Sequence, residues 1–335
     1  MRSIEAPGTF KLGIAAMALA FFSAPCPGTA QESVVLKAAD VQPEGYPTVE
    51  ALARMGIKLH AATNGRLSIE IHPSMRLGGE REVIEQTRAG TIQIARVSNG
   101  LIGQLVPELE VLNLPYMFRD AAHLESMMDG PIGDELLKRI TQSPRSEIVA
   151  LGWMSSGTRN IYNNSRPIRT IRDLKGLKIR VIPDSVFVDT MEMFGATGIG
   201  LGYDRLVDAL KSGLVDGAEN NEPSYTAGEH FKYAKYYSLT GHLTMPELLV
   251  FSKQAWLRLS SSDQALIMKL AREAQLEQRA LWAEMEKKSL AKMSQEGVEI
   301  NEVSDKRPFV VAVYPVWQWH GSQFLSLIRR IQDIR

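Results

Sequence analysis

The stretch Leu177-Lys178-Ile179-Arg180-Val181 alternates between apolar and charged side chains. A period of two is typical of a strand with one buried face, so we predict a strand here with Arg180 on the side opposite the apolar residues. A helix is predicted over residues 204–211, and a second short strand over residues 215–220. Strands that alternate with helices in this way indicate a mainly parallel α/β sheet.

The same order of elements occurs earlier in the chain. Strands are predicted over residues 34–39, 67–71, 92–94 and 147–151, and helices over residues 49–62 and 82–89. Two rounds of this pattern predict two α/β domains, with the chain crossing between them near Gly157. Because no low-complexity linker separates the two rounds, we expect strands to join the domains.

A long helix is predicted near the end of the chain. Ser261-Ser262-Asp263 supplies N-cap chemistry, and apolar residues recur at helical spacing until Gly297. About 33 residues at ~1.5 Å each give a helix of roughly 50 Å, which is longer than one small domain. We therefore expect the helix to span both domains. The apolar positions do not keep the strict heptad of a coiled-coil dimer, so we expect a monomer.

These elements give a provisional domain assignment. We assign residues 31–156 and about 245–285 to domain I, and residues 157–244 and about 286–335 to domain II.

The N-terminus has the three parts of an export signal. Arg2 and Lys11 precede an apolar run over residues 12–22, and Gly28-Thr29-Ala30 forms a small-residue cleavage site. The apolar run is too short to span a bilayer as a helix. We expect cleavage after Ala30 and export to the periplasm.

Composition narrows the choice of function. The 335 residues include 38 Lys and Arg against 38 Asp and Glu, so nothing favours nucleic acid or an anionic membrane surface. The single cysteine, Cys26, lies in the leader, so the mature chain has no thiol for a disulfide, catalysis or a metal. A lipid anchor on Cys26 is the alternative, but Pro25 precedes it where a small flexible residue is needed.

Four polar side chains stand out as candidates for ligand binding. Arg180 lies at the end of a parallel strand, where open α/β sheets place their ligands, and its planar guanidinium matches a carboxylate. Arg159 follows an apolar strand and is a second candidate cation. Asn220 and Asn221 end another strand, where amides can bind hydroxyls or a carboxylate. A solvated or ion-paired arginine, and asparagines that satisfy turn backbone, are the alternatives.

Local motifs for catalysis are not found in the sequence. The six histidines are scattered, with no HExxH pair, and no GxSxG elbow is present. Residues 195–202 are glycine-rich, but the spacing departs from a phosphate loop, so we expect a turn into a helix. We therefore predict no cofactor, no metal and no enzymatic activity.

Five segments resemble the periplasmic solute receptors of tripartite ATP-independent periplasmic (TRAP) transporters, and the resemblance extends over essentially the whole mature chain. The segments are Leu77-Gly78-Gly79-Glu80-Arg81, Leu114-Pro115-Tyr116-Met117-Phe118, Gly157-Thr158-Arg159, Leu174-Lys175-Gly176-Leu177-Lys178-Ile179-Arg180 and Val215-Asp216-Gly217-Ala218-Glu219-Asn220. The last two together are highly specific. The resemblance implies a periplasmic-binding-protein-like fold, in which two α/β domains close about a hinge on an organic acid.

The resemblance also implies roles for single residues. Arg180 matches the arginine that clamps the ligand carboxylate in this family, Asn220 matches its partner, and Arg159 matches a second cationic contact. Tyr203 falls where an aromatic residue often lines the ligand. Positions that contact the rest of the ligand in some members are matched by Glu80, Asn99, Gln42, Tyr237 and His242.

Residues 216–225 and 235–240 resemble the branch that binds sugar acids such as glucuronate or galacturonate. Glu222 stands where that branch commonly has tryptophan, and Gln42 where it often has histidine. The resemblance implies delivery to the small and large membrane subunits of a TRAP permease. A keto, aromatic or dicarboxylic acid ligand, a ligand-sensing module and a periplasmic sugar-acid enzyme are the alternatives.

The export signal gives a first testable prediction. Mass spectrometry of the protein isolated from the periplasm is expected to find a mature chain that begins at Gln31. A lipid-modified chain that begins at Cys26 would contradict this prediction.

Overall fold

The computed structural model describes residues 1–6, 8–9 and 33–335. The predicted cleavage site at Ala30, the apolar run and Cys26 lie outside the described residues. By contacts the chain divides into two units, residues 1–32 and residues 33–335, and every described helix and strand belongs to the second. No helix among the described residues is both long enough and apolar enough to cross a membrane.

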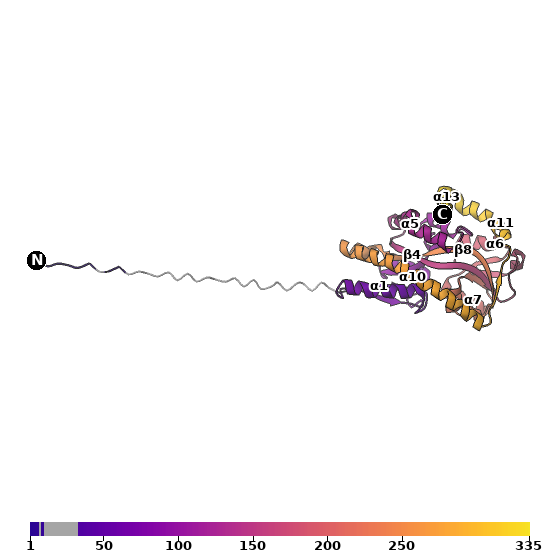
Figure 1. The fold of residues 1–335 in the computed structure, drawn as a ribbon, viewed down its shortest axis with the longest axis horizontal. Coiled ribbons are helices and arrows are strands. Elements are labelled where there is room, and N and C mark those ends of the chain that lie inside the picture. The colour runs from indigo at the N-terminus through magenta and orange to yellow at the C-terminus, as the bar shows by residue number, and fades with distance from the viewer. Residues whose placement is uncertain (7, 10–32) are drawn as a thin grey trace. The chain divides into compact units, whose positions relative to one another are not determined.

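The second unit is an α/β structure built on strands and helices that alternate along most of the chain (Figure 1). The strands are β1 (Val34–Ala39), β2 (Leu67–His72), β3 (Ile94–Ser98), β4 (Ile148–Asn163), β5 (Lys178–Val181), β6 (Thr197–Gly200), β7 (Gly217–Asn220), β8 (Tyr236–Ser252) and β9 (Glu299–Glu302). The helices are α1 (Pro47–Ala62), α2 (Glu80–Arg88), α3 (Asn99–Ile102), α4 (Ala121–Asp129), α5 (Pro131–Gln142), α6 (Ser185–Met193), α7 (Leu206–Ser212), α8 (Glu222–Ala227), α9 (Lys253–Trp256), α10 (Ser261–Gln295), α11 (Arg307–Ala312), α12 (Tyr314–Val316) and α13 (Leu325–Gln332).

All nine described strands form one sheet in the order β2-β1-β3-β8-β4-β7-β5-β6, with β9 paired to β8. Pairing is parallel at both ends, between β1 and its neighbours and between β5 and its neighbours. At the centre, β8 runs antiparallel to β3 and β4, and β4 runs antiparallel to β7. The prediction of a mainly parallel sheet is therefore right for the flanks and wrong for the centre, because two long strands return through the middle of the sheet.

Strands β4 and β8 are the longest in the sheet. The strand predicted over residues 147–151 continues through β4 to Asn163, and β8 accompanies it antiparallel. Their register shifts between Ser155 and Thr158, where Gly157 has a φ of +63°. An irregularity of this kind lets a long strand bend without ending. The chain thus passes through Gly157 within a strand, with no loose connection.

Helix α10 confirms the prediction of a long helix. It has 35 residues, and the Ser260 hydroxyl caps it by accepting a hydrogen bond from the backbone N–H of Asp263 at 3.1 Å. The helix packs on α1, on β4 and on α8 (residues 222–227), and Figure 1 shows it running lengthwise across the sheet. A single helix therefore contacts elements from both halves of the sheet.

Apolar side chains form separate clusters on the two halves. One cluster joins β1 and α1 to the first part of α10, through residues such as Leu36, Leu52 and Ile267. Another joins Tyr162 and Tyr237 to Met293 in the last part of α10. The largest cluster continues along the sheet through both halves.

Two elements differ from their predictions. The third strand begins at Ile94 instead of Ile92 and continues to Ser98. The glycine-rich residues 195–202 contain the edge strand β6, where we expected only a turn. A Cβ atom on Gly198 would lie 2.8 Å from the Val188 carbonyl oxygen of α6, so the close packing of this helix explains the glycine.

The bend of β4 gives a testable prediction. A Cβ atom on Gly157 would lie 2.8 Å from both Glu286 Oε1 and Trp282 Nε1, in addition to the unfavourable positive φ. Gly176 also has a positive φ, +80°, but open space around it. We expect Gly176→Ala to lower the free energy of unfolding by about 1 kcal/mol, and Gly157→Ala to lower it clearly more. Equal losses in chemical denaturation would show that the crossing point tolerates a side chain.

Candidate functional site

Polar side chains from many elements converge on one cleft, which we call the polar cleft. Its lining consists of Val41, Gln42, Glu80, Arg96, Ser98, Arg159, Arg180, Ile182, Tyr203, Asn220, Ser224 and Glu247. The polar cleft itself encloses about 30 Å³, and Glu80, Arg180, Ile182 and Tyr203 also line a neighbouring cavity of about 340 Å³. That volume lies in the range of roughly 300–1,000 Å³ that is usual for small-molecule sites.

Sheet geometry brings the predicted cations together. Strand β7 lies between β4 and β5, with Asn220 opposite Asn160 of β4, and Ala218 opposite Arg180 of β5. Arg159 and Arg180 therefore approach Asn220 from strands on either side of it. The sequence predicted all three residues as a group, and all three line the polar cleft.

Arg159 is buried and forms an ion pair with Glu219. Its Nε and Nη2 donate to the two carboxylate oxygens of Glu219, and its Nη1 donates to Asn220 Oδ1 at 2.9 Å. Burial alone would raise the pKa of Glu219, but the charge and hydrogen bonds of Arg159, together with the neighbouring His242, lower it to about 2. The pair is therefore ionised and close to neutral as a unit, and it holds the Arg159 guanidinium in a fixed orientation.

Arg180 is equally buried but has no counter-ion. Only 2% of it is exposed, and its Nε donates to the Leu201 carbonyl oxygen at 2.8 Å. Among residues 33–335 no carboxylate forms an ion pair with it, because Glu219 is committed to Arg159. Burial lowers the pKa of Arg180. The charge of Glu219 opposes this shift, and the charge of Arg159 reinforces it. A buried, uncompensated cation is costly, so this end of the cleft favours an anion.

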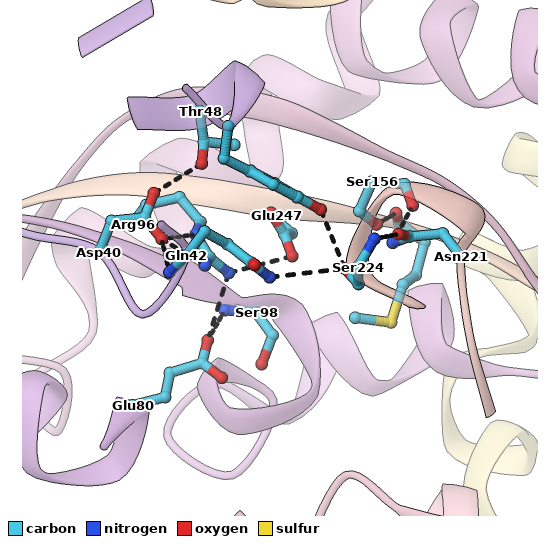
Figure 2. Close-up of polar contacts among 12 residues, drawn as sticks. Asp40, Gln42, Thr48, Glu80, Arg96, Ser98, Ser156, Asn221, Ser224 and Glu247 are labelled. Atoms are coloured by element: carbon cyan, nitrogen blue, oxygen red, sulfur yellow. Dashed lines mark hydrogen bonds and ion pairs between the residues drawn. The ribbon is translucent and has the colours of Figure 1, made fainter. Parts of the chain in front are cut away.

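The opposite end of the cleft holds a cluster that the sequence did not predict, which we call the Arg96 cluster. Arg96 donates to Asp40 through Nε and Nη2, donates to Glu247 Oε1 at 3.1 Å, and lies 4.0 Å from Glu80 (Figure 2). A sequence signal was present, because Arg96 and Glu247 are single charges inside apolar runs. The predicted strand ended at Ile94, so Arg96 and Ser98 were not placed on it.

Gln42 and Ser224 connect two sides of the cleft. Gln42 Nε2 donates to Ser224 Oγ at 3.4 Å, and the Tyr46 hydroxyl lies 2.9 Å from the same oxygen. Figure 2 shows Gln42 directed from the Arg96 cluster toward Ser224. Ser224 is held in turn by Asn221, which accepts a hydrogen bond from its backbone N–H at 2.7 Å. The Tyr203 hydroxyl donates to the Ser224 carbonyl oxygen at 3.3 Å.

Of the ten predicted site residues, six line the polar cleft: Gln42, Glu80, Arg159, Arg180, Tyr203 and Asn220. The other four lie behind the lining. Asn99 donates to the Leu109 carbonyl oxygen and Asn113, and Asn221 caps α8 and donates to the Ser156 carbonyl oxygen. Tyr237 donates to the Asn220 carbonyl oxygen at 2.9 Å, and His242 lies 3.7 Å from Glu219. These four side chains support lining residues or neighbouring backbone, and the structure does not place them at the cavity.

Glu222 differs in position from the cleft residues. It lies at the start of α8, where it accepts a hydrogen bond from Asn160 Nδ2 at 3.0 Å. Burial, reinforced by the nearby charge of Glu286, raises the pKa of Glu222 to about 7. Glu222, which stands where the sugar-acid branch commonly has tryptophan, is not among the residues that line the polar cleft.

The two ends of the cleft differ in charge and in the hydrogen-bonding groups that they offer. One end has two arginines, of which one lacks a counter-ion, and the other end has mainly hydrogen-bond acceptors. Within the part of the chain that the structure describes, no three His, Cys, Asp or Glu side chains gather as a metal site. Such a cleft is suited to capture a small anion that also carries hydroxyl groups.

The fold and this cleft are those of a two-lobed receptor for small solutes. The chain belongs to the bacterial extracellular solute-binding proteins, family 7, whose model matches residues 38–323. The family resemblance read from the sequence is therefore confirmed.

The chain is also similar to solved structures of TRAP periplasmic solute-binding proteins. A TRAP periplasmic solute-binding protein from Pseudomonas putida F1 with bound D-glucuronate is 44% identical, with a TM-score of 0.88, and the match covers 90% of this chain and 98% of that chain. A protein of the same description from Xanthobacter autotrophicus Py2, with bound β-D-galacturonate, is 38% identical, with a TM-score of 0.86, and the match covers 90% and 100% of the two chains.

A third relative, from Citrobacter koseri, was solved in two states. Its structure with bound D-glucuronate is 42% identical to this chain, with a TM-score of 0.88 and coverage of 90% and 100%. Its apo, open structure gives 40% identity and a TM-score of 0.79, with coverage of 89% and 98%. The arrangement of this chain is thus closer to the uronate-bound form than to the open form.

The buried position of Glu222 predicts a pH effect on stability. Its pKa is about 7 in the folded chain against 4.5 as the usual value, so ionisation destabilises the folded state progressively as pH rises from 4.5 to 7. Glu222→Gln keeps an acceptor for Asn160 without the charge. We expect its melting temperature, relative to the natural chain, to rise by a few degrees (~2–4 °C) between pH 4.5 and pH 8. Glu299→Gln, on the exposed strand β9, serves as control, and an equal difference at both pH values for Glu222→Gln would contradict the prediction.

Proposed function

We propose that this protein is the periplasmic receptor of a TRAP transporter and that it captures a monocarboxylic sugar acid such as D-glucuronate or D-galacturonate. The observation that carries the proposal is Arg180, a buried cation without a counter-ion that lines the polar cleft. The uronates bound by the relatives from Pseudomonas putida and Xanthobacter autotrophicus support the ligand class.

The charges at this end of the cleft favour one carboxylate. Arg159 and Glu219 neutralise each other, so the net charge of the three residues is that of Arg180. A ligand carboxylate can pair with Arg180 and accept further hydrogen bonds from Arg159 and Asn220. A charge-assisted pair of this kind is strong in a cleft from which water is largely removed.

Capture proceeds by closure of two domains in this proposal. Gln42, Glu80, Arg96 and Glu247 belong to domain I as assigned from the sequence, whereas Arg159, Arg180, Tyr203, Asn220 and Ser224 belong to domain II. A ligand that contacts both groups shifts the population toward the closed state. The hydrogen bonds of Gln42 and Tyr46 to Ser224 join the two domains, and the stronger similarity to the uronate-bound Citrobacter koseri structure supports a closed arrangement.

The same proposal covers location and partners. The predicted export signal and the family support a periplasmic receptor. We propose that it acts without catalysis and as a monomer. Its partners are the small and large membrane subunits of a TRAP permease, to which the closed receptor delivers its ligand.

A thermal-shift screen over uronates, keto acids, aromatic acids and dicarboxylates tests the ligand class. A ligand at 100 times its dissociation constant stabilises the folded state by about 2.7 kcal/mol. We expect uronates to raise the melting temperature most. Flat responses to every carboxylate would contradict the proposal.

Arg180→Met tests the carboxylate clamp because it keeps most of the side-chain volume and removes the charge. Truncating one partner of a buried charge pair costs about 2–5 kcal/mol, so we expect D-glucuronate affinity in calorimetry to fall by roughly 100-fold or more. Arg172→Ala, in an arginine outside the cleft lining, serves as the matched control. Unchanged affinity in Arg180→Met would show that the carboxylate binds elsewhere.

A further inference from the structure

Three buried oxygen atoms at the Arg96 end of the polar cleft have no hydrogen-bond partner among residues 33–335. They are Gln42 Oε1, Ser98 Oγ and Glu247 Oε2, and all three residues line the cleft. The residues are only 4%, 4% and 7% exposed, respectively. A buried acceptor without a partner is destabilising, so three in one place indicate that something else supplies their donors.

The sheet places two of these residues next to each other. Ser98 of β3 and Glu247 of β8 are opposite each other in the antiparallel register. Side chains at opposite positions lie on the same face of a sheet, about 5 Å apart at Cβ. Gln42 follows β1 and is held nearby by its hydrogen bonds to Asp40 and Ser224. All three residues line the same cleft, so donor groups on one small molecule in the cleft would satisfy their unpartnered oxygens.

The charge of Arg96 is already balanced by carboxylates of the chain, so it offers little to a second anion. Its Nε and Nη2 donate to Asp40, and its Nη1 donates to Glu247 Oε1. Asp40, Glu80 and Glu247 surround it, so carboxylates exceed cations in the Arg96 cluster. A second ligand carboxylate placed here would meet acceptors and negative charge. A ligand ammonium at Glu247 Oε2 would in turn lie close to the Arg96 guanidinium, which favours neutral hydroxyls as donors.

We propose that Gln42, Ser98 and Glu247 form a hydroxyl-binding subsite opposite the carboxylate clamp, and that this subsite selects sugar acids with one carboxylate over dicarboxylic sugar acids of the same length. The inference rests on the proposed function, because it assumes that Arg180 holds the carboxylate at the other end. It assigns specificity to Ser98 and Glu247, two residues that the family resemblance did not mark.

The environment of Glu247 adds a pH signature to the subsite. Burial raises the pKa of Glu247 to about 7. The charges of Glu80 and Asp40 reinforce the rise, whereas the charges of Arg96 and of Arg159 on β4 oppose it. The Tyr46 hydroxyl also faces this group. Hydroxyl donors favour the ionised carboxylate, so a bound sugar acid lowers the pKa of Glu247. Affinity through this residue is therefore full above pH 7 and declines as the pH falls below it.

Calorimetry with D-glucuronate and D-glucarate at pH 8.0 and pH 5.5 tests the proposal on the full mature chain. We expect the natural chain to prefer glucuronate by at least about tenfold at pH 8.0. Glu247→Gln should lose roughly tenfold in glucuronate affinity, narrow the preference over glucarate, and lose most of the pH dependence.

A pair of serine variants provides the matched control. Ser98 and Ser155 are both buried with an unpartnered Oγ, but only Ser98 lines the cleft. Ser98→Ala is expected to weaken glucuronate binding severalfold, whereas Ser155→Ala should leave it unchanged. The two serine variants test the hydroxyl-binding subsite even if Glu247→Gln fails to fold.

The outcomes separate the two proposals. If the natural chain binds no uronate, the proposed function fails. If it binds glucuronate but Glu247→Gln and Ser98→Ala keep its affinity and its discrimination against glucarate, the subsite is overturned while the carboxylate receptor stands. Tighter binding of an amino acid than of glucuronate would also overturn the subsite, because it would show that this end of the cleft takes an ammonium.

Discussion

The antiparallel pairing of β4 with β8 is the interaction on which the rest of the molecule depends. These two strands cross the centre of the sheet, and the parallel strands on either side pair outward from them. Each strand also carries a residue of the cleft, because Arg159 lies on β4 and Glu247 on β8. Helix α10 lies along β4 and packs on elements of both halves. The pairing therefore fixes the sheet and sets the separation between the two ends of the binding cleft.

Charge compensation then decides what the cleft can hold. Three arginines are buried in its lining, and two of them are neutralised by carboxylates of the chain itself. Arg180 alone among them lacks a counter-ion in the described part of the chain, so the folded protein carries the free-energy cost of desolvating that cation. Around Arg96, in contrast, carboxylates outnumber cations. This difference in charge along the cleft suits a molecule with one charged end and one hydroxylated end.

The sequence predicted Arg180, Arg159 and Asn220, the proposed carboxylate-binding residues, better than the remainder of the site. Arg180, Arg159 and Asn220 follow from strand alternation and from segments typical of the family, since local patterns determine where a strand residue points. Arg96 and Glu247 were missed because their function depends on the register between β3 and β8, which are about 150 residues apart and which no local pattern relates. The antiparallel centre of the sheet was missed for a similar reason: β4 and β8 contain bends that hide their length. Asn99, Tyr237 and His242 were predicted from the family resemblance, and Asn221 from its place at the end of a strand. In the structure the polar atoms of all four contact other parts of the chain.

Gln42 has a consequence beyond its place in the lining. Its amide nitrogen donates to Ser224, across the proposed domain boundary, while its amide oxygen is buried without a partner among residues 33–335. A planar amide moves as a rigid unit, so the orientation that satisfies Ser224 is also the orientation that presents Oε1 to a ligand. If the proposed closure on a ligand holds, occupancy and closure are linked through this side chain, and linkage is reciprocal. A substitution of Gln42 is then expected to change the affinity for ligand and the tendency to close together.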